Sequence, residues 1–185
     1  MDDLTRLADL VASAEPPKAV LDKTALVLAD SVGAIVGGAA EPEVEALTDR
    51  LCAGSHGAAQ VIGSAHRAAP QTAALLNGTA GTTLEMDEGN QFAKGHPGMH
   101  AIPAVLAAAA GRDLPGRAVL TAMAVGYEAG ARVGIATTLR PAMHPHGTWG
   151  AIGAAAGVMR LNGAAPDAVR DAMNMAASLG LTTSR

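Results

Sequence analysis

Histidines and carboxylates gather in two irregular stretches of the sequence, residues 85–98 and 139–147. Histidine titrates near neutral pH, so a pair of histidines can serve as general acid and general base. A carboxylate beside an imidazole can orient the ring or take a proton itself. The residue types therefore indicate proton-transfer chemistry. The candidates are Glu85, Asp87, Glu88 and His96 in the first stretch, and His144 and His146 in the second, with Thr148 directly after it.

Both stretches precede predicted helix N-termini, where unpaired N–H groups and the helix dipole favour anions. A site built in this way suits a substrate that carries carboxylates. We expect the two stretches to meet across the helices.

The same residues also fit less specific roles. The carboxylates suit a solvated loop or a helix cap, and His96 before Pro97 suits a turn. His144 and His146 are two apart, so they do not share a helix face. His96 and His100 have the i, i+4 spacing of a metal pair on a helix, but Pro97 and the glycine after it argue against that role. We predict no metal and no cofactor.

Composition indicates the fold class and excludes two kinds of site. The chain has 185 residues, a net charge of −4, 49% hydrophobic residues, 22 glycines and only 2% aromatic residues. Alanine favours helices, whereas strands favour β-branched and aromatic residues, so we predict an all-α protein. The single cysteine, Cys52, excludes an intrachain disulfide framework and a multi-cysteine metal site.

The charge pattern argues against two classes of partner. With a pI near 5.8 and no run of Lys or Arg, neither nucleic acid nor an anionic membrane is an expected partner. The start Met1-Asp2-Asp3 has no basic segment of a secretory signal, and no stretch is typical of a membrane span. We therefore expect a cytoplasmic protein.

The elements that must position the polar residues are eight or nine helices in one domain, residues 1–185. Leu21, Ala25, Leu28, Val32 and Ile35 repeat at helical spacing, with Pro16-Pro17 before them and Gly37-Gly38 after them. Residues 58–63 form a short strand or an extended link. The other helices are predicted at about 3–14, 42–52, 68–84, 99–110, 116–138, 148–161 and 166–179.

Several motifs, taken in order, resemble the MmgE/PrpD family over nearly the whole chain. This family includes 2-methylcitrate dehydratase, cis-aconitate decarboxylase and iminodisuccinate epimerase. The motifs are Asp30, Gly33, Gly37-Gly38, Asn77-Gly78, Leu84-Glu85-Met86-Asp87-Glu88, His96-Pro97-Gly98, Ile102-Pro103-Ala104, Gly126-Tyr127-Glu128, Arg132, His144, Gly147-Thr148, Gly150 and Ala177-Ser178-Leu179-Gly180.

The resemblance implies metal-independent enzymes that act on small di- and tricarboxylates. It makes His96, His144, Asp87 and Glu85 the catalytic candidates. Glu88, Thr148 and His146 become the candidates for substrate binding. Glu85 stands where the family usually has aspartate, which moves the carboxylate out by one methylene.

The family also implies a longer protein, in which a following segment carries a site lysine and a smaller α/β domain completes the site. We therefore expect this chain to be the N-terminal helical part of a lyase or isomerase, most simply a dehydratase of the 2-methylcitrate type. A homo-oligomer, or a second chain that supplies the remaining part, is the expected partner. The alternative is a non-catalytic helical scaffold or a partner subunit of a split enzyme.

Overall fold

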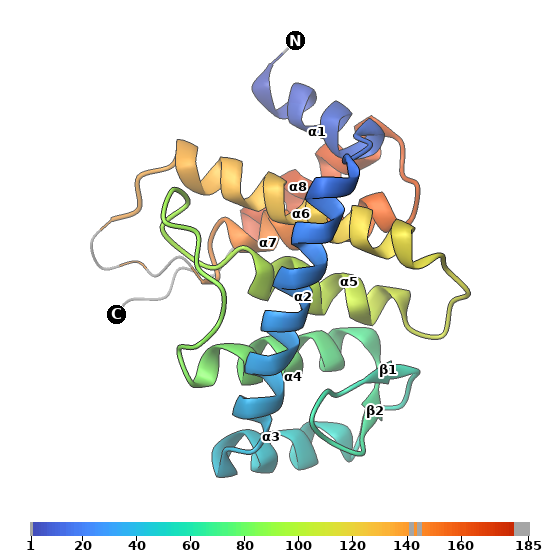
Figure 1. Cartoon of the computed structure of the whole chain (residues 1–185), viewed down its shortest axis with the longest axis vertical. Helices are drawn as coiled ribbons and strands as arrows, with labels where there is room; N and C mark the ends of the chain where they lie inside the picture. Colours follow the sequence, from blue (N-terminus) through green and yellow to red (C-terminus); the bar gives the residue numbers. More distant parts are fainter. Residues whose placement is uncertain (1, 141–142, 144–145, 180–185) are drawn as a thin grey trace.

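The computed structural model describes residues 2–140, 143 and 146–179 (Figure 1). This part of the chain forms eight helices and one small hairpin, so the all-α prediction is confirmed. The elements are α1 (Asp3–Ser13), α2 (Lys18–Ala39), α3 (Pro42–Cys52), β1 (Ala59–Gln60), β2 (Arg67–Ala68), α4 (Pro70–Thr83), α5 (Gly98–Ala109), α6 (Gly116–Ala136), α7 (Gly150–Leu161) and α8 (Pro166–Leu179).

Proline sets several of the helix starts. Pro42 and Pro70 each occupy the first turn of a helix, where the missing N–H costs no hydrogen bond. The predicted link at residues 58–63 contains β1, which pairs with β2 in antiparallel register, Ala59 opposite Ala68.

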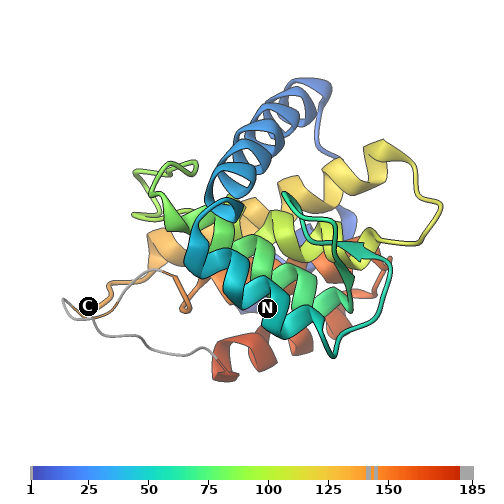
Figure 2. The same ribbon diagram turned by 90° about the horizontal axis from the view of Figure 1, so that it is seen from below.

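α4, α5 and α6 lie side by side, and α2 crosses them on one face (Figure 1). α7 packs against α5 and α6, and α8 then packs against α7 and α1. Figure 2, seen from below, shows α2 and α8 on opposite sides of this layer. The buried face of α2 is centred on Leu21, Ser31 and Ile35, and Ala25, predicted to share that face, is exposed.

α6 and α7 cross at glycines, which lets their backbones approach closely. A Cβ added to Gly126 would lie 2.8 Å from the carbonyl oxygen of Gly153 and 2.9 Å from the Cα of Gly157. A Cβ added to Gly153 would lie 2.7 Å from the carbonyl oxygen of Gly126. This crossing fixes the position of the start of α7 relative to α5 and α6.

Asn77, inside α4, anchors the hairpin to the helices. Its side chain is buried, accepts a hydrogen bond from the Ile62 N–H at 2.9 Å and donates one to the Gln60 carbonyl at 3.1 Å. At the neighbouring Gly78, a Cβ would meet only an ordinary contact, with the Met99 carbonyl oxygen at 3.7 Å. Gly81 is the position of close approach, where a Cβ would lie 2.3 Å from the Met99 sulfur.

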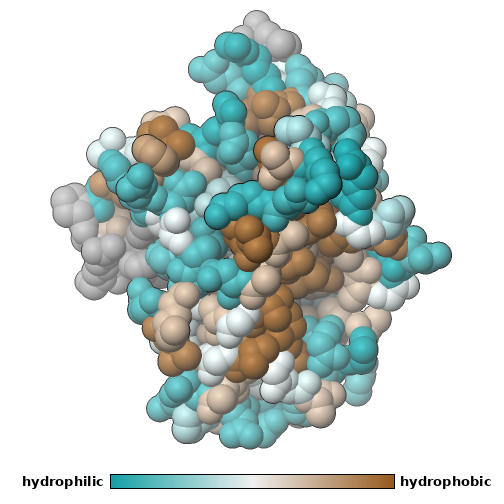
Figure 3. All heavy atoms as spheres, in the orientation of Figure 1, coloured by the Kyte–Doolittle hydropathy of each residue, from teal (hydrophilic) through white to brown (hydrophobic). Residues whose placement is uncertain are grey.

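α2 leaves apolar side chains on the surface. Val20, Leu26 and Val36 are 44%, 65% and 49% exposed, and Figure 3 shows an apolar stripe along this face. No helix in the described part of the chain combines the length and the hydropathy that crossing a membrane requires.

Candidate functional site

The segment between α4 and α5 folds back on itself and brings its acidic residues to the start of α5. Asn90 and Gly95 pair across the fold, with N–O distances of 2.8 and 3.3 Å. The side-chain oxygen of Asn90 also accepts hydrogen bonds from the N–H groups of Phe92 and Ala93. This turn returns the chain so that Asp87 and Glu88 lie against His96.

Asp87 and His96 form a pair in which the carboxylate is buried and the imidazole is partly exposed. The Oδ2 atom of Asp87 lies 3.1 Å from the Nδ1 atom of His96, and the Asp87 side chain is only 2% exposed. The Nδ1 proton points elsewhere, to the backbone carbonyl of Glu88 at 2.7 Å. Oδ2 consequently has no hydrogen bond, and its contact with the imidazole is electrostatic.

This arrangement determines which nitrogen of His96 can act as a base. A neutral imidazole carries one donor nitrogen and one acceptor nitrogen. Because Nδ1 donates to the Glu88 carbonyl, Nε2 is the acceptor. The Asp87 carboxylate stabilises the imidazolium that forms when Nε2 takes a proton. The pair is therefore suited to general acid–base chemistry.

Glu88 fastens this segment to α5 and α6. One carboxylate oxygen accepts a hydrogen bond from the Gly98 N–H at the start of α5, and the other accepts one from the Tyr127 hydroxyl at 3.0 Å. Burial raises the pKa of Glu88 to about 7, although both hydrogen bonds and the charge of His96 act in the opposite direction. Glu88 thus binds the N-terminus of α5, one of the helix N-termini that were expected to bind a substrate anion.

Tyr127 reaches the site from the middle of α6. Its hydroxyl donates to Glu88 and accepts a hydrogen bond from the Asn90 side chain at 3.3 Å. Burial raises the pKa of Tyr127 to about 12, so the hydroxyl remains a donor at physiological pH. Tyr127 therefore links the segment before α5 to α6.

His146, from the turn before α7, completes the cluster. Its ring stacks on that of His96, with the centroids 5.1 Å apart and the planes at 20°. Its Nδ1 atom lies 3.1 Å from the Nε2 atom of His100, in the first turn of α5. The two irregular stretches do meet, and they do so through histidine rings.

A cavity of about 420 Å³ adjoins His100 and His146. Thr79 and Thr82 of α4 and Met99 of α5 also line it. A space of this size beside the imidazoles can admit a small ligand.

The other predicted site residues lie as follows. Glu85 is exposed at the end of α4 with a left-handed φ of 52°, and its carboxylate forms no hydrogen bond or ion pair among the described residues. Thr148 is half-buried in the same turn as His146. His144 lies outside the described residues.

Two residues of this cluster were not among the predicted site residues. Tyr127 is the single tyrosine of the chain, yet its local sequence carries no sign of the contact with Glu88. His100 has the i, i+4 spacing of a metal pair with His96, a role that Pro97 argues against. The structure places His96 before the start of α5, and the ring of His146 contacts both histidines.

Donor atoms of Asp87, His96 and His146 lie within 4.8 Å of one another, the one such grouping of three in the described residues. Stacked, nearly parallel rings direct their in-plane lone pairs side by side, so they do not converge on one point. The Nδ1 atom of His96 is also bonded to a carbonyl. This geometry fits proton transfer better than a tetrahedral metal site.

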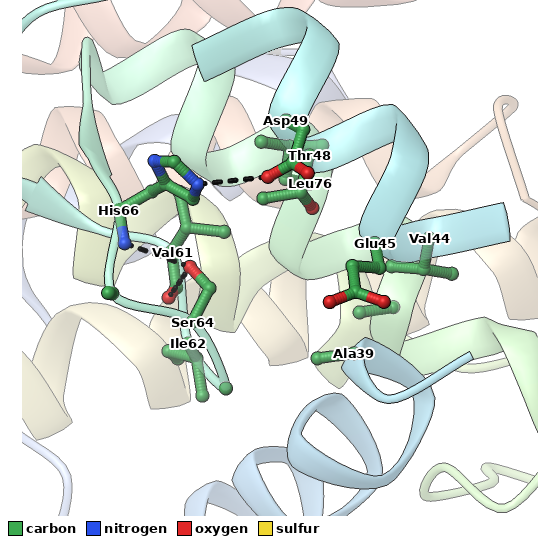
Figure 4. Close-up of a pocket in the computed structure, with 13 residues that line it drawn as sticks. Ala39, Val44, Glu45, Thr48, Asp49, Val61, Ile62, Ser64, His66 and Leu76 are labelled. Atoms are coloured by element: carbon green, nitrogen blue, oxygen red, sulfur yellow. Dashed lines mark hydrogen bonds and ion pairs between the residues drawn. The ribbon is translucent and has the colours of Figure 1, made fainter. Parts of the chain in front are cut away.

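A second histidine–aspartate pair lies at the rim of a smaller cavity, of about 190 Å³, between α3 and the hairpin (Figure 4). The Nε2 atom of His66 lies 3.1 Å from the Oδ1 atom of Asp49, and the two side chains are 43% and 69% exposed. His56, between α3 and β1, is exposed.

Residues 2–184 match the MmgE/PrpD N-terminal domain. The chain belongs to the MmgE/PrpD family. It is 28% identical to cis-aconitate decarboxylase of Aspergillus terreus over 184 residues, which cover 94% of this chain and 38% of that enzyme. It is 34% identical over 131 residues to a cis-aconitate decarboxylase-like protein of Aspergillus oryzae, covering 65% of this chain and 27% of that protein. This MmgE/PrpD chain thus spans well under half the length of these relatives.

Proposed function

We propose that this chain carries the acid–base part of a lyase active site for small di- or tricarboxylates. One observation carries the proposal: the buried Asp87 carboxylate lies 3.1 Å from an imidazole whose Nδ1 proton is held by the Glu88 carbonyl. His96 then takes or gives a proton at Nε2, and Asp87 stabilises its charged form.

Two reactions fit this chemistry. In a dehydration of the 2-methylcitrate type, the base removes a proton from the carbon next to a carboxylate. The acid then protonates the departing hydroxyl, which leaves as water. In a decarboxylation, carbon dioxide leaves and the carbon that held it takes a proton from the acid. The names of the two Aspergillus relatives favour the second reaction.

In either reaction His144 is the proposed second acid–base residue. Glu85 is proposed to position or share the proton with Asp87, and His146 and Thr148 are proposed to hold or orient the substrate. Since both oxygens of Glu88 are bonded to Gly98 and Tyr127, we infer that Glu88 acts by holding the segment around Asp87 in place.

A substrate panel tests the proposal. The chain is incubated with 2-methylcitrate, citrate, cis-aconitate and iminodisuccinate, and the products are followed by mass spectrometry. Turnover that His96→Ala abolishes supports the assignment. Full activity in His96→Ala would overturn it. If the chain alone is silent, the panel is repeated with a second chain carrying the family's remaining part.

The same preparation tests the alternative of a non-catalytic scaffold. A scaffold gives no turnover even with that second chain present, and variants of His96 then change nothing. Self-association stays a prediction, and light scattering at micromolar concentration measures it.

A further inference from the structure

The backbone carbonyl of Glu88 selects the tautomer of His96. It lies 2.7 Å from the Nδ1 atom of the imidazole. Because a carbonyl oxygen only accepts hydrogen bonds, Nδ1 must carry the proton, and Nε2 keeps the lone pair that a base needs. The position of this one carbonyl therefore decides which nitrogen of His96 can take a proton from a substrate.

The side chain of the same residue is held at both of its oxygens. One oxygen accepts a hydrogen bond from the Gly98 N–H, and the other accepts one from the Tyr127 hydroxyl at 3.0 Å. A Cβ at Gly98 would lie 2.7 Å from the first oxygen, so the carboxylate occupies the space that a side chain would take. Gly98 belongs to the same stretch of chain as His96, whereas Tyr127 belongs to α6. The bond with Tyr127 therefore fixes Glu88 relative to α6.

Tyr127 holds the segment before α5 at a second point. Its oxygen accepts a hydrogen bond from the side-chain nitrogen of Asn90 at 3.3 Å. The side-chain oxygen of Asn90 is already the acceptor for the N–H groups of Phe92 and Ala93, so its nitrogen is the atom that faces Tyr127. The Tyr127 oxygen thus accepts from Asn90 and donates its own proton to Glu88.

The packing of α6 gives Tyr127 a fixed position. The preceding residue, Gly126, lies at the close crossing with α7, where a Cβ would meet the Gly153 carbonyl oxygen at 2.8 Å. The Tyr127 ring packs against a buried cluster that includes Ala93 and Trp149. Side chains on packed helices are held more precisely than side chains on loops, so α6 positions the segment through Tyr127.

We propose that Tyr127 is a positioning residue: its hydroxyl holds Glu88 so that the Glu88 carbonyl keeps the proton of His96 on Nδ1 and leaves Nε2 as the base. Asn90 supplies the second attachment to the same hydroxyl. The consequence for catalysis rests on the proposed function. The competing interpretation is that Tyr127 contributes only its ring to the core. Phenylalanine retains the ring and lacks the hydroxyl, so Tyr127→Phe separates the two roles.

Ring-nitrogen NMR of the whole chain tests the positioning role without any need for turnover. Long-range proton–nitrogen correlations report which nitrogen of the neutral His96 ring carries the proton. We expect the Nδ1–H form to predominate in the wild-type chain and the Nε2–H form to rise several-fold in Tyr127→Phe. The matched control is Thr137→Val at the end of α6, because the Thr137 hydroxyl bonds to the Val133 and Gly134 carbonyls of its own helix. It should leave the His96 tautomers unchanged.

The pH dependence of stability is a second readout of the same contact. The Tyr127 hydrogen bond lowers the pKa of Glu88 against the larger effect of burial, and His96 and Asp87 are the charged groups that also act on it. Loss of the hydroxyl should therefore raise this pKa above its value of about 7. The decline of the unfolding free energy with rising pH should then extend to higher pH in Tyr127→Phe. A decline in the same pH range as in the wild-type chain would show that the hydroxyl does not hold the carboxylate.

Glu88→Gln reaches the same contact from the other side and keeps the test decisive if Tyr127→Phe does not fold. An amide cannot accept hydrogen bonds at both of its ends, so one of the bonds to Gly98 and Tyr127 is lost, and the Nε2–H form of His96 should again rise. If Tyr127 acts through Glu88, the double variant should show little more than either single change. Unchanged His96 tautomers in both single variants would overturn the positioning role.

Kinetics connect the orientation of His96 with catalysis. For a substrate that responds in the panel, Tyr127→Phe should lower kcat by about tenfold or more and change KM much less, as is typical when a group that orients a catalytic residue is removed. Thr137→Val should leave both constants unchanged. An unaltered kcat in Tyr127→Phe would overturn the catalytic consequence. A wild-type chain that shows the expected tautomers but gives no turnover, even with the second chain, would overturn the proposed function and leave the contact of Tyr127 with Glu88 intact.

Discussion

The described part of the chain contains two histidine–aspartate pairs with the same nitrogen–oxygen distance, 3.1 Å, in very different surroundings. Asp49 and His66 are 69% and 43% exposed, so water and salt screen their interaction. Asp87 is 2% exposed, and its Oδ2 atom has no hydrogen bond. Distance alone therefore does not identify a functional pair. Burial and the destination of the imidazole proton distinguish the two.

Activity should separate the pairs most strongly. His96→Ala should lower the turnover of a responsive substrate by at least ~100-fold, because positioned acid–base groups typically contribute 10²–10⁴-fold. His66→Ala, the matched control, should leave turnover unchanged. Initial rates measured by mass spectrometry decide this, and equal effects of the two substitutions would remove the distinction between the pairs.

At Asp87, stability is expected to rise while activity falls. A buried carboxylate oxygen without a hydrogen bond is costly, and Oδ2 of Asp87 is such an atom, so Asp87→Asn should raise the free energy of unfolding by about 1–3 kcal/mol while activity falls. Asp49→Asn should change it by less than about 1 kcal/mol. Urea denaturation measures both values. A large loss of stability in Asp87→Asn would show that the pair is structural.

Glu88, the residue after Asp87, should make the free energy of unfolding depend on pH. Its pKa rises from 4.5 to about 7 on folding, so the folded state holds the proton over this interval while the unfolded state releases it. The stabilisation is complete below pH 4.5 and is lost as the pH rises towards 7. Glu88→Gln should flatten this decline in urea titrations between pH 4.5 and 7.5.

The matched control for Glu88 is Glu85→Gln, at an exposed carboxylate in the same segment. It should keep the pH dependence of the wild-type chain. A decline that persists unchanged in Glu88→Gln would mean that another group titrates.

The smallest effect is expected at the exposed pair itself. His66→Ala should alter the free energy of unfolding by about 0–1 kcal/mol at low salt, and the difference should shrink in 1 M salt as the charges are screened. A larger, salt-independent loss would show that His66 contributes through packing around the small cavity.

The helices were predictable because local signals set them. Prolines such as Pro42 and Pro70 mark the starts, glycine-containing turns separate the segments, and alanine favours helix throughout. The face of α2 was predicted less well. The helix crosses a layer of three others, so exposure at Ala25 depends on the crossing and not on periodicity alone.

The polar residues of the site were predictable by type, whereas their partners were not. Asp87 and His96 belong to one local segment, and the sequence placed them together. The contacts of His146 with His96 and His100, and of Tyr127 with Glu88, join segments that meet only when α5, α6 and α7 pack. No local spacing encodes such contacts.

The close crossing of α6 and α7 at glycines limits which substitutions the chain can tolerate. Gly126 and Gly153 touch no histidine, yet a methyl group at either position would push α7 away and carry Gly150 and the turn of His146 with it. Substitution of either glycine should therefore impair the site, although neither residue belongs to the histidine cluster. A saturation mutagenesis screen for function should show them as intolerant, in contrast to Gly33, where a Cβ would meet nothing within 4 Å.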